Sequence, residues 1–309
     1  MLRRTCLAAA CVAVVVAFTS SWSADAQSAR QPSSPGAARA ASHATSALMP
    51  ASSPEALGFD SQRLAKLDAY MAKVVAGGRV AGMSTLLARH GQVVSEKIYG
   101  SRSLATGAPM TRDTIFRLYS MSKPITGVAM MMLFEDGRWQ LDDPITKFVP
   151  EFKALKVMSG TDADGRPTVQ DLKRPPTMRE LMSHTAGFGY GLGDQHPVDK
   201  LYREKRVLGA NGLADMIKRT AEIPLMFQPG TKWSYSSAVD IQGYIVEKLS
   251  GQKFGEFLQQ RIFMPLKMTD TAFYVSPEKA ARLAAVYAGN PKTAKIEEVK
   301  DLFGMPMPT

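Results

Sequence analysis

The segment from residue 115 to residue 137 constrains the fold most, because it joins a serine–lysine pair to a long apolar helix. It reads IFRLYSMSKPITGVAMMMLFEDG. We expect a short strand-like piece, then Ser120 to Lys123, then a helix that is apolar on all faces and therefore buried. Ser120 and Lys123 are three residues apart, so they share one helix face. The sequence thus predicts a hydroxyl and an amine held together at a helix N-terminus, the parts of an activated nucleophile.

The S-x-x-K spacing is not specific by itself, because the chain contains it three times. It occurs at Ser120–Lys123, Ser250–Lys253 and Ser276–Lys279. Ser250 precedes a glycine at a predicted helix end, and Ser276 precedes a proline as an N-cap, so both have structural explanations. Only Ser120 precedes a long apolar helix, where burial gives Lys123 a reason to lose its charge.

The chemistry at Ser120 needs a base and an oxyanion donor. A serine hydroxyl is a weak nucleophile until a base takes its proton, and lysine is a poor base until burial or a neighbouring cation lowers its pKa. The backbone N–H of Ser120, at the helix start, is placed to bind a developing oxyanion. Ser122 is the alternative nucleophile, but it points off the face of Lys123.

The third candidate is Tyr235, in the loop sequence QPGTKWSYSS of residues 228–237. A Pro-Gly turn and the helix expected after Ala238 hold this tyrosine at a loop–helix junction, from which it can reach another helix's N-terminus. From these residues alone, a packed aromatic with a satisfied hydroxyl is the simpler explanation of Tyr235.

Composition bears on several classes of function. The 309 residues carry a formal net charge of +10 and are 45% hydrophobic, as in an ordinary globular protein. The basic residues form no concentrated stripe, so we expect a solvated surface and no nucleic-acid partner. Both cysteines, Cys6 and Cys11, lie near the start, and the four histidines lack ligand spacing. We therefore expect no metal and no cofactor.

Residues 1–26 are typical of a secretory signal peptide. Two arginines precede the 13-residue apolar run Cys6–Phe18, and Ala-Asp-Ala at 24–26 fits a cleavage site. The run is too short for a stable membrane span, so we expect an exported protein, periplasmic or extracellular, with a lipidated Cys11 as the alternative. Residues 27–53 are rich in Ala, Ser and Pro, which predicts a disordered linker before a globular domain of residues 54–309.

Periodicity places the elements of that domain. We expect a helix after Asp60, a hairpin of 83–88 and 93–99 turning at His90, and a capping box at Thr177–Glu180. Further helices are expected around 213–219, 241–249 and 254–262, with an irregular loop over 153–176. Asp142 and Asp143 look like a carboxylate pair, but capping a helix explains them more simply. One hairpin is a marginal sheet, so strands are missing from this order of elements.

Four motifs in one order carry a resemblance to a known family. They are SMSK at 120–123, LDDP at 141–144, LMSHTAG at 181–187, and PGT to YSS at 229–237. From about Pro54 to the end, the chain resembles the serine β-lactamase-related hydrolases, which comprise class C β-lactamases, D-alanyl-D-alanine carboxypeptidases and, closest in wording, family VIII carboxylesterases. The resemblance implies an α/β fold of the α+β type, β-lactamase/transpeptidase-like, with an antiparallel sheet flanked by helices plus an all-helical region.

The resemblance also implies roles for the site residues. Ser120 is implied to be the acylated nucleophile, Lys123 its base or proton shuttle, and Tyr235 the residue that relays protons to the leaving group. His184 and Thr185 are implied to be structural.

Two departures from the family pattern stand out. Ser237 replaces the asparagine of the Y-x-N motif, which favours an esterase over a β-lactamase. The strand with K-T-G, H-T-G or W-x-G lies beyond the matched region, so we expect the C-terminal strands to be missing and half of the oxyanion hole with them.

The sequence therefore predicts a secreted serine hydrolase that forms an acyl-enzyme at Ser120 and acts, as a carboxylesterase, on small-molecule esters. A β-lactamase or D,D-peptidase acting on lactams or peptidoglycan is the first alternative. A truncated, non-catalytic protein is the second. The chain has no G-x-S-x-G elbow, so an α/β-hydrolase triad is not expected. The sequence predicts no oligomeric state.

Overall fold

The computed structural model describes residues 49–193, 195–302 and 305–306, within a compact unit of Thr45–Thr309. The predicted signal peptide and residues 27–48 of the predicted linker lie outside the described residues. β1 (Met49–Pro50) pairs in parallel with β3 (Gln92–Gly100). Residues 49 and 50 therefore belong to the sheet and not to the linker predicted over 27–53.

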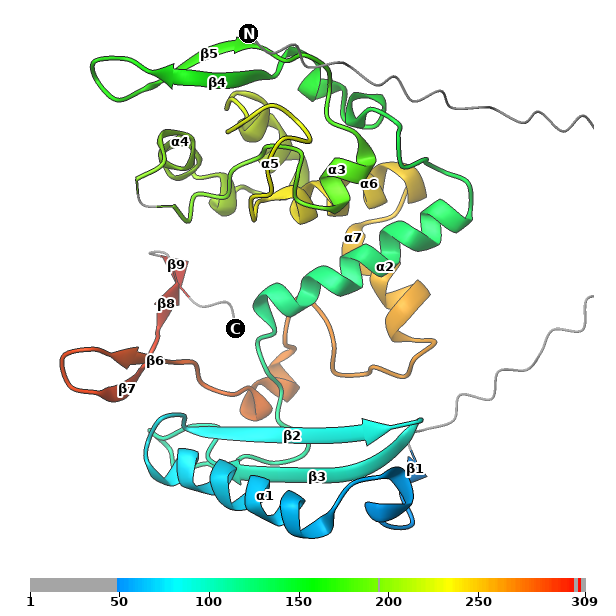
Figure 1. The fold of residues 1–309 in the computed structure, drawn as a ribbon, viewed down its shortest axis with the longest axis vertical. Helices are drawn as coiled ribbons and strands as arrows, with labels where there is room; N and C mark the ends of the chain where they lie inside the picture. The colour runs from blue at the N-terminus through cyan, green and yellow to red at the C-terminus, as the bar shows by residue number, and fades with distance from the viewer. Residues whose placement is uncertain (1–48, 194, 303–304, 307–309) are drawn as a thin grey trace, which may run out of the picture. The chain divides into compact units, whose positions relative to one another are not determined.

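The first part of the unit is a small sheet with one helix against it. β2 (Gly82–Arg89) and β3 form the predicted antiparallel hairpin, and the strand order is β1-β3-β2. α1 (Ser61–Ala76) follows η1 (Glu55–Leu57) and begins where the Asp60 carboxylate accepts a hydrogen bond from a backbone N–H in its first turn. α1 packs against β3 (Figure 1). The predicted helix, cap and hairpin are confirmed.

The serine–lysine segment forms η2 (Tyr119–Met121) and α2 (Ser122–Glu135). Its buried residues lie on one face, which packs against α6 (Ala238–Ser250). Val128 and Met131 are 51% and 40% exposed on other faces. The prediction of a helix buried all round is therefore wrong for the described part of the chain, because the elements described there cover only one side of α2.

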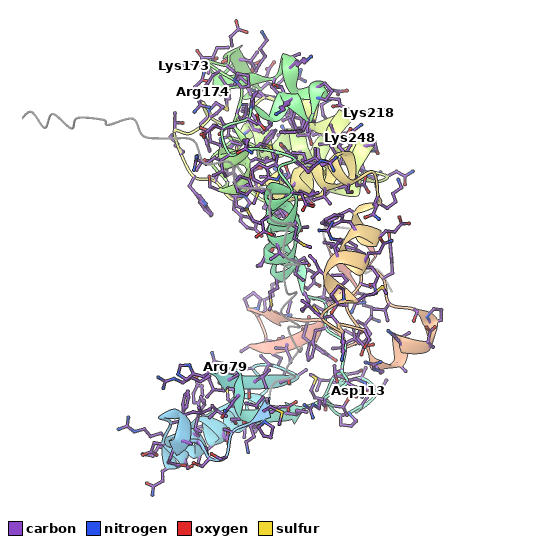
Figure 2. All side chains as sticks on the ribbon, turned by 90° about the vertical axis from the view of Figure 1, so that its right-hand side faces the viewer. Arg79, Asp113, Lys173, Arg174, Lys218 and Lys248 are labelled. Atoms are coloured by element: carbon purple, nitrogen blue, oxygen red, sulfur yellow. The ribbon has the colours of Figure 1, made fainter. Side chains whose placement is uncertain are left out.

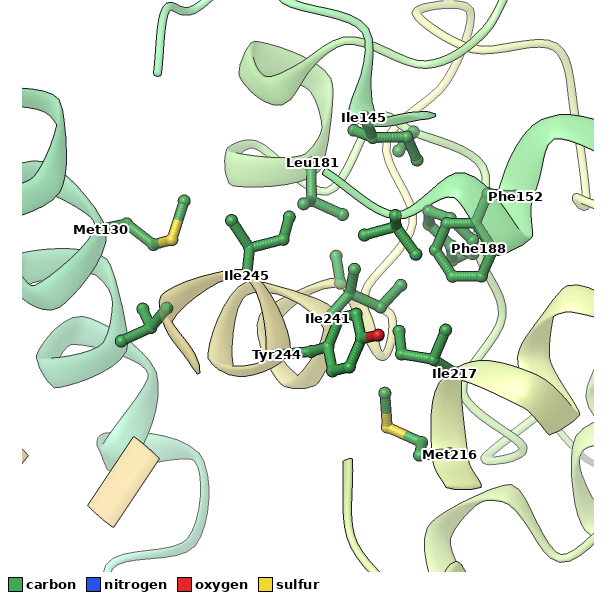
Figure 3. Packing of buried hydrophobic residues seen from close by; sticks show 14 of the residues in the cluster. Met130, Ile145, Phe152, Leu181, Phe188, Met216, Ile217, Ile241, Tyr244 and Ile245 are labelled. Atoms are coloured by element: carbon green, nitrogen blue, oxygen red, sulfur yellow. The ribbon is translucent and has the colours of Figure 1, made fainter. Parts of the chain in front are cut away.

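α6 is the centre of the hydrophobic core. Ile241 and Ile245 are fully buried on it and contact side chains from the surrounding helices (Figure 3). These neighbours include Met130 of α2, Leu181 of α3 (Met178–Met182), and Met216 and Ile217 of α5 (Leu213–Ala221). The core fixes α6 against α2, which is the relationship that the site depends on.

The remaining elements are short. They are η3 (Ile145–Lys147), η4 (Pro150–Ala154), β4 (Lys156–Thr161), β5 (Pro167–Asp171), α4 (Pro197–Glu204), η5 (Val207–Gly209), α7 (Phe254–Leu258), the π-helical η6 (Gln259–Phe263), η7 (Pro277–Arg282), β6 (Tyr287–Asn290), β7 (Lys295–Glu298), β8 (Asp301–Leu302) and β9 (Met305–Pro306). β4–β5, β6–β7 and β8–β9 are separate antiparallel pairs.

Residues 153–176 differ from the predicted irregular loop, because they contain the β4–β5 hairpin. Its tip is closed by Asp162, whose side chain accepts two backbone N–H bonds. β4 is joined to the core by an N–H to carbonyl bond from Met158 to Leu225. Glycine and proline dominated the sequence pattern here and concealed two strands of five and six residues.

Charged side chains spread over the surface of the described residues, as the labelled examples of Figure 2 show. Asp143 accepts from the backbone N–H of Gln140 and pairs with Lys147, and Asp142 pairs with Arg179. These two acids serve local structure, although the residue at the N-cap of η3 is Pro144 and not an aspartate. Among the described residues, no helix is long and apolar enough to cross a membrane.

Candidate active site

The three predicted site residues lie together. Lys123 donates a hydrogen bond from Nζ to Ser120 Oγ over 3.2 Å. The hydroxyl of Tyr235 lies 2.5 Å from the same Oγ and donates to it. Ser120 lies in η2 directly before α2, Lys123 lies in the first turn of α2, and Tyr235 comes from the loop that enters α6. The packing of α2 on α6 thus brings a hydroxyl, an amine and a phenol to one point.

Ser120 owes its exposure to the turn before it. Tyr119 has a φ of +45°, which is unusual for a residue with a bulky side chain. The turn sets Ser120 in η2, one residue before the N-cap of α2, with its side chain exposed. Strained backbone of this kind concentrates at functional sites.

The other serines that the sequence offers as nucleophiles lack the contacts that Ser120 makes. Both polar contacts from Lys123 and Tyr235 reach Ser120, and within the described residues the hydroxyl of Ser122 makes no hydrogen bond. Ser250 donates to the carbonyl of Val246 at the end of α6, over 2.6 Å. Ser276 is the N-cap of η7 with proline after it. The structural explanations predicted for Ser250 and Ser276 are confirmed.

The charge of Lys123 differs from the expectation. Burial lowers its pKa, but the hydrogen bond with Tyr235 and the nearby phenols of Tyr190 and Tyr235 outweigh burial and raise the pKa above 10.5. The ammonium also lies 4.6 Å from the centre of the Tyr235 ring. The predicted loss of charge by burial is therefore wrong, because one face of α2 remains open and polar groups surround the amine.

The pKa of Tyr235 moves in the opposite direction. Burial raises it, but hydrogen bonds with Lys123 and Ser120 and the positive charge of Lys123 outweigh burial, and the pKa falls below 10.0. An ammonium beside a phenol favours the phenolate. The pair therefore favours a protonated lysine and a more acidic tyrosine.

Sequence reasoning missed Tyr190. Its hydroxyl lies 3.5 Å from Lys123 Nζ, and its ring meets the Tyr235 ring edge-on at 5.5 Å. The buried carboxylate of Asp199 holds this residue by accepting the backbone N–H groups of Tyr190, Gly191 and Gly193 at 2.7 to 3.0 Å.

The loop that carries Tyr190 could have been recognised by its alternating glycines. They lie in the sequence GFGYGLG at 187–193. A Cβ at Gly193 would lie 2.4 Å from an oxygen of Asp199, and Gly191 has a φ of +87°. Each glycine therefore allows the backbone to close around the carboxylate. Alternating glycines next to a buried acid could have indicated a preformed loop.

Asp240 was also missed. It stands in the first turn of α6 and lines the same cavity as Ser120 and Lys123. Burial raises its pKa, and the charge of Lys123 opposes that rise only in part. Asp240 and Lys123 line the same cavity, and the positive charge of Lys123 acts on this carboxyl group.

His184 lies beside the tyrosine. Its ring stacks on the Tyr235 ring, with 5.2 Å between centres and 28° between planes. Its Nδ1 accepts a hydrogen bond from the backbone N–H of Ser236 over 3.2 Å. Burial and then the charge of Lys123 lower the pKa of this imidazole below 6.5.

A cavity of about 1520 Å³ opens at Ser120. It is bounded by the start of α2, the start of α6 and the segment from α7 through residue 274. Its wall combines aromatic side chains, among them Tyr190 and Phe273, with the carboxylate of Asp240. The space suits an organic molecule of moderate size that presents one reactive bond to the serine.

Comparison with known sequences decides the family. A profile of the Beta-lactamase family matches residues 67–306. The chain belongs to the Beta-lactamase family. The predicted family and fold class are thereby confirmed, including the relation to β-lactamase/transpeptidase-like proteins.

The chain is also similar to individual proteins of known sequence or structure. The chain is 33% identical to Protein Rv1367c of Mycobacterium tuberculosis over 220 residues, covering 71% of this chain and 54% of that protein. It is 32% identical to Esterase EstB of Burkholderia gladioli over 260 residues, covering 82% and 62%. It is similar in structure to EstCE1, a hydrolase with promiscuous acyltransferase activity, with a TM-score of 0.65, 29% identity, and 78% and 60% coverage. The chain thus spans between about half and two thirds of the length of these relatives.

Ser237 takes a different place from the one that its motif suggests. Its side chain is fully buried and donates to the carbonyl of Gly189 over 3.1 Å. Its backbone N–H donates to the same carbonyl over 3.0 Å. In this member of the Beta-lactamase family, the third motif position therefore anchors the loop and presents no polar group to the cavity.

Proposed function

We propose that this chain is a secreted serine hydrolase that forms an acyl-enzyme at Ser120 and acts on small carboxylic esters. The observation that carries the proposal is the convergence of two groups on one hydroxyl oxygen. Tyr235 lies 2.5 Å and Lys123 3.2 Å from Ser120 Oγ. Both distances allow proton transfer or charge stabilisation at the oxygen that attacks.

In the proposed acylation step, Tyr235 acts as the general base in its phenolate form, stabilised by the Lys123 ammonium. The hydroxyl proton of Ser120 moves to the Tyr235 oxygen as the bond from Oγ to the ester carbonyl carbon forms. The tetrahedral intermediate then loses its alkoxy group, which takes the proton from Tyr235 and leaves as an alcohol. Water repeats the sequence on the acyl-enzyme and releases the acid and free Ser120.

The oxyanion of the intermediate needs hydrogen-bond donors. We propose the backbone N–H of Ser120, at the positive end of α2, as one of them. Removing one donor of an oxyanion hole lowers the rate by about 100-fold to 1000-fold.

The buried position of the Ser237 side chain favours esters over lactams as substrates. Its hydroxyl is bonded to the carbonyl of Gly189 and is not available to a substrate amide. The relative EstB is named an esterase, which supports the same direction. The alternatives remain a β-lactamase or D,D-peptidase, and a chain without catalytic activity.

One experiment separates these alternatives. The purified chain is assayed with p-nitrophenyl butyrate and with nitrocefin, alongside Ser120→Ala and, as a matched control, Ser122→Ala. We expect ester turnover that is lost in Ser120→Ala and kept in Ser122→Ala, with an acyl adduct on the peptide that contains Ser120 in mass spectrometry. Nitrocefin turnover above ester turnover would support the lactam alternative. Ester turnover that survives in Ser120→Ala would overturn the proposal, and turnover of neither substrate would support a non-catalytic chain.

We also propose export to the periplasm or beyond, on the basis of residues 1–26. The test is fractionation of cells that express the full chain and a form without these residues. Export predicts the full chain outside the cytoplasm with a new N-terminus near Gln27. Equal cytoplasmic retention of both forms would overturn it.

A further inference from the structure

His184 holds the catalytic tyrosine loop from both sides of Tyr235. Its carbonyl oxygen accepts the backbone N–H of Ser234 over 3.0 Å. Its ring Nδ1 accepts the backbone N–H of Ser236 over 3.2 Å. The residues before and after Tyr235 are therefore tied to one histidine, which fixes the backbone from which the phenol projects.

The ring of His184 also contacts the phenol itself. The two rings stack at 5.2 Å and 28°, and Trp233 meets the His184 ring edge-on at 6.1 Å. Offset stacking restricts the rotation of the tyrosine ring. Backbone and side chain of Tyr235 are thus both restrained by the same residue.

The backbone of His184 adopts an unusual conformation. Its φ is +59°, in the left-handed region that histidine and asparagine adopt more readily than most residues. This conformation turns the chain at the end of α3 and brings both the carbonyl and the ring towards the tyrosine loop. The neighbouring bond from the N–H of Gly230 to the carbonyl of Thr185 continues the same attachment over 2.9 Å.

The contacts at Nδ1 favour one protonation state of the ring. Nδ1 accepts the backbone N–H of Ser236 and lies 3.1 Å from the Oγ of Ser236, whose hydroxyl can also donate to it. Both contacts suit a neutral ring with its proton on Nε2. Protonation of Nδ1 would place a ring N–H against a backbone N–H and break that bond. The titratable groups around the ring are the Lys123 ammonium from α2 and the phenol of Tyr235, with Tyr190 and Asp240 next in the site.

We propose that His184 is a positioning residue for Tyr235, and that it holds the phenol oxygen against Ser120 only while its imidazole is neutral. This proposal rests on the proposed hydrolase function. His184 touches no reacting atom and acts through the tyrosine. A purely structural histidine would stabilise the end of α3 without influencing the catalytic step.

Two substitutions separate the contacts. His184→Asn keeps an acceptor near the place of Nδ1 and tolerates the positive φ, but it removes the ring. His184→Phe keeps a ring to stack on Tyr235 but removes the acceptor. His90→Asn is the matched control, because His90 also has a positive φ, of +50°, at the exposed turn between β2 and β3.

The expected results are specific. His184→Asn should lower kcat for p-nitrophenyl butyrate about ten-fold and leave KM within two-fold, because misplaced catalytic groups reduce the rate more than binding. His184→Phe should recover part of that loss, and His90→Asn should match the wild type. Thermal melts of His184→Asn and His90→Asn should stay within a few degrees of the wild type, which separates positioning from unfolding. His184→Phe is assayed well below its own melting temperature, because phenylalanine adopts a positive φ less readily.

The pH profile gives the second readout. At acid pH, kcat/KM of the wild type should fall with a slope of two, one proton for Tyr235 and one for His184. In both His184 variants the slope should be one, because the second ionisation is gone. A wild-type kcat in His184→Asn, or a slope of two that persists in both variants, would overturn the proposal. Activity that is independent of Ser120 would instead overturn the proposed function, so the two failures are distinguishable.

Discussion

The Tyr235 hydroxyl approaches the Ser120 Oγ to 2.5 Å although 115 residues separate them in the chain. The contact exists because α2 and α6 pack through fully buried side chains, and each helix presents its N-terminal end to the other. The position of a phenol oxygen is therefore set by core packing. The predictions below follow from this relationship and from the charges around it.

Tyr235→Phe should lower kcat for ester hydrolysis by roughly 100-fold to 10,000-fold, the usual contribution of a general base. The ring and its stacking on His184 are kept, so the thermal melt should not change. Steady-state assays with p-nitrophenyl butyrate measure the effect. Tyr274→Phe is the matched control, since this exposed tyrosine lines the same cavity without contacting Ser120. Full activity in Tyr235→Phe would assign the base to another group.

The pH dependence follows from the directions of two pKa shifts. Activity should rise with pH as Tyr235 loses its proton, at a pKa below 10.0, and fall as Lys123 loses its own, above 10.5. Lys123→Met removes the charge that stabilises the phenolate. The acid limb of kcat/KM should therefore move to higher pH in this variant.

The control for Lys123→Met is Lys253→Met, which changes the lysine of the second S-x-x-K sequence and also lines the cavity. Its pH profile should overlay that of the wild type. An acid limb that moves to lower pH in Lys123→Met would contradict the assignment of Lys123 as the stabilising cation.

Glu180→Gln should destabilise the fold by about 1–2 kcal/mol, in the range for hydrogen bonds to a charged group with a partly exposed partner. Glu180 accepts from Arg174 and from the backbone N–H of Thr177, which completes the capping box of α3. Urea unfolding at pH 7 measures the difference, and Glu204→Gln, on the exposed face of α4, serves as the control.

The pKa of Glu180 leads to a prediction of how folding stability depends on pH. Burial raises the pKa of Glu180, but hydrogen bonds from Arg174 and Thr177 outweigh it, and the pKa falls below 4.5. A carboxyl with a depressed pKa stabilises the fold above its unfolded pKa, and this is lost as pH falls through the folded pKa. The gap between wild type and Glu180→Gln should therefore narrow below about pH 4.5. A constant gap down to pH 3 would show that the charge is not involved.

Thr220→Val should stabilise the protein by about 1 kcal/mol, because it removes a buried hydroxyl that lacks a partner. Thr220 is fully buried in α5, and among the described residues its Oγ1 makes no hydrogen bond. Valine keeps the shape, so packing should be retained. Calorimetry should show a higher melting temperature with unchanged activity. A lower melting temperature would mean that the hydroxyl has a partner such as bound water.

The sequence predicted which residues form the candidate site, but it did not predict the pKa of Lys123. Ser120 and Lys123 could be predicted because helix spacing is a local property of the chain. The role of Tyr235 was implied only by the resemblance to the family. The pKa of Lys123 could not be predicted, since it depends on Tyr190 and Tyr235, which reach the amine only through tertiary packing. The role of Tyr190 was also concealed, because the acid that holds its backbone comes nine residues later.

The same distinction explains the differences in the fold. The helix after Asp60 and the hairpin at His90 carry strong local signals, and both were predicted. The β4–β5 hairpin was not, because its strands are short and polar and β4 is joined to the core through a bond to Leu225. Pairing of Met49 and Pro50 with β3 likewise depends on a partner more than 40 residues away.

Asp199 collects three backbone N–H groups of the loop that carries Tyr190. The glycine-rich loop therefore loses its conformational entropy when the protein folds. Ligand binding then costs little further conformational entropy in this loop. Affinity for substrate should then be sensitive to a residue that no substrate touches. A family member that kept every cavity-lining side chain but lacked this aspartate would present the same groups on a loop that becomes ordered only when ligand binds.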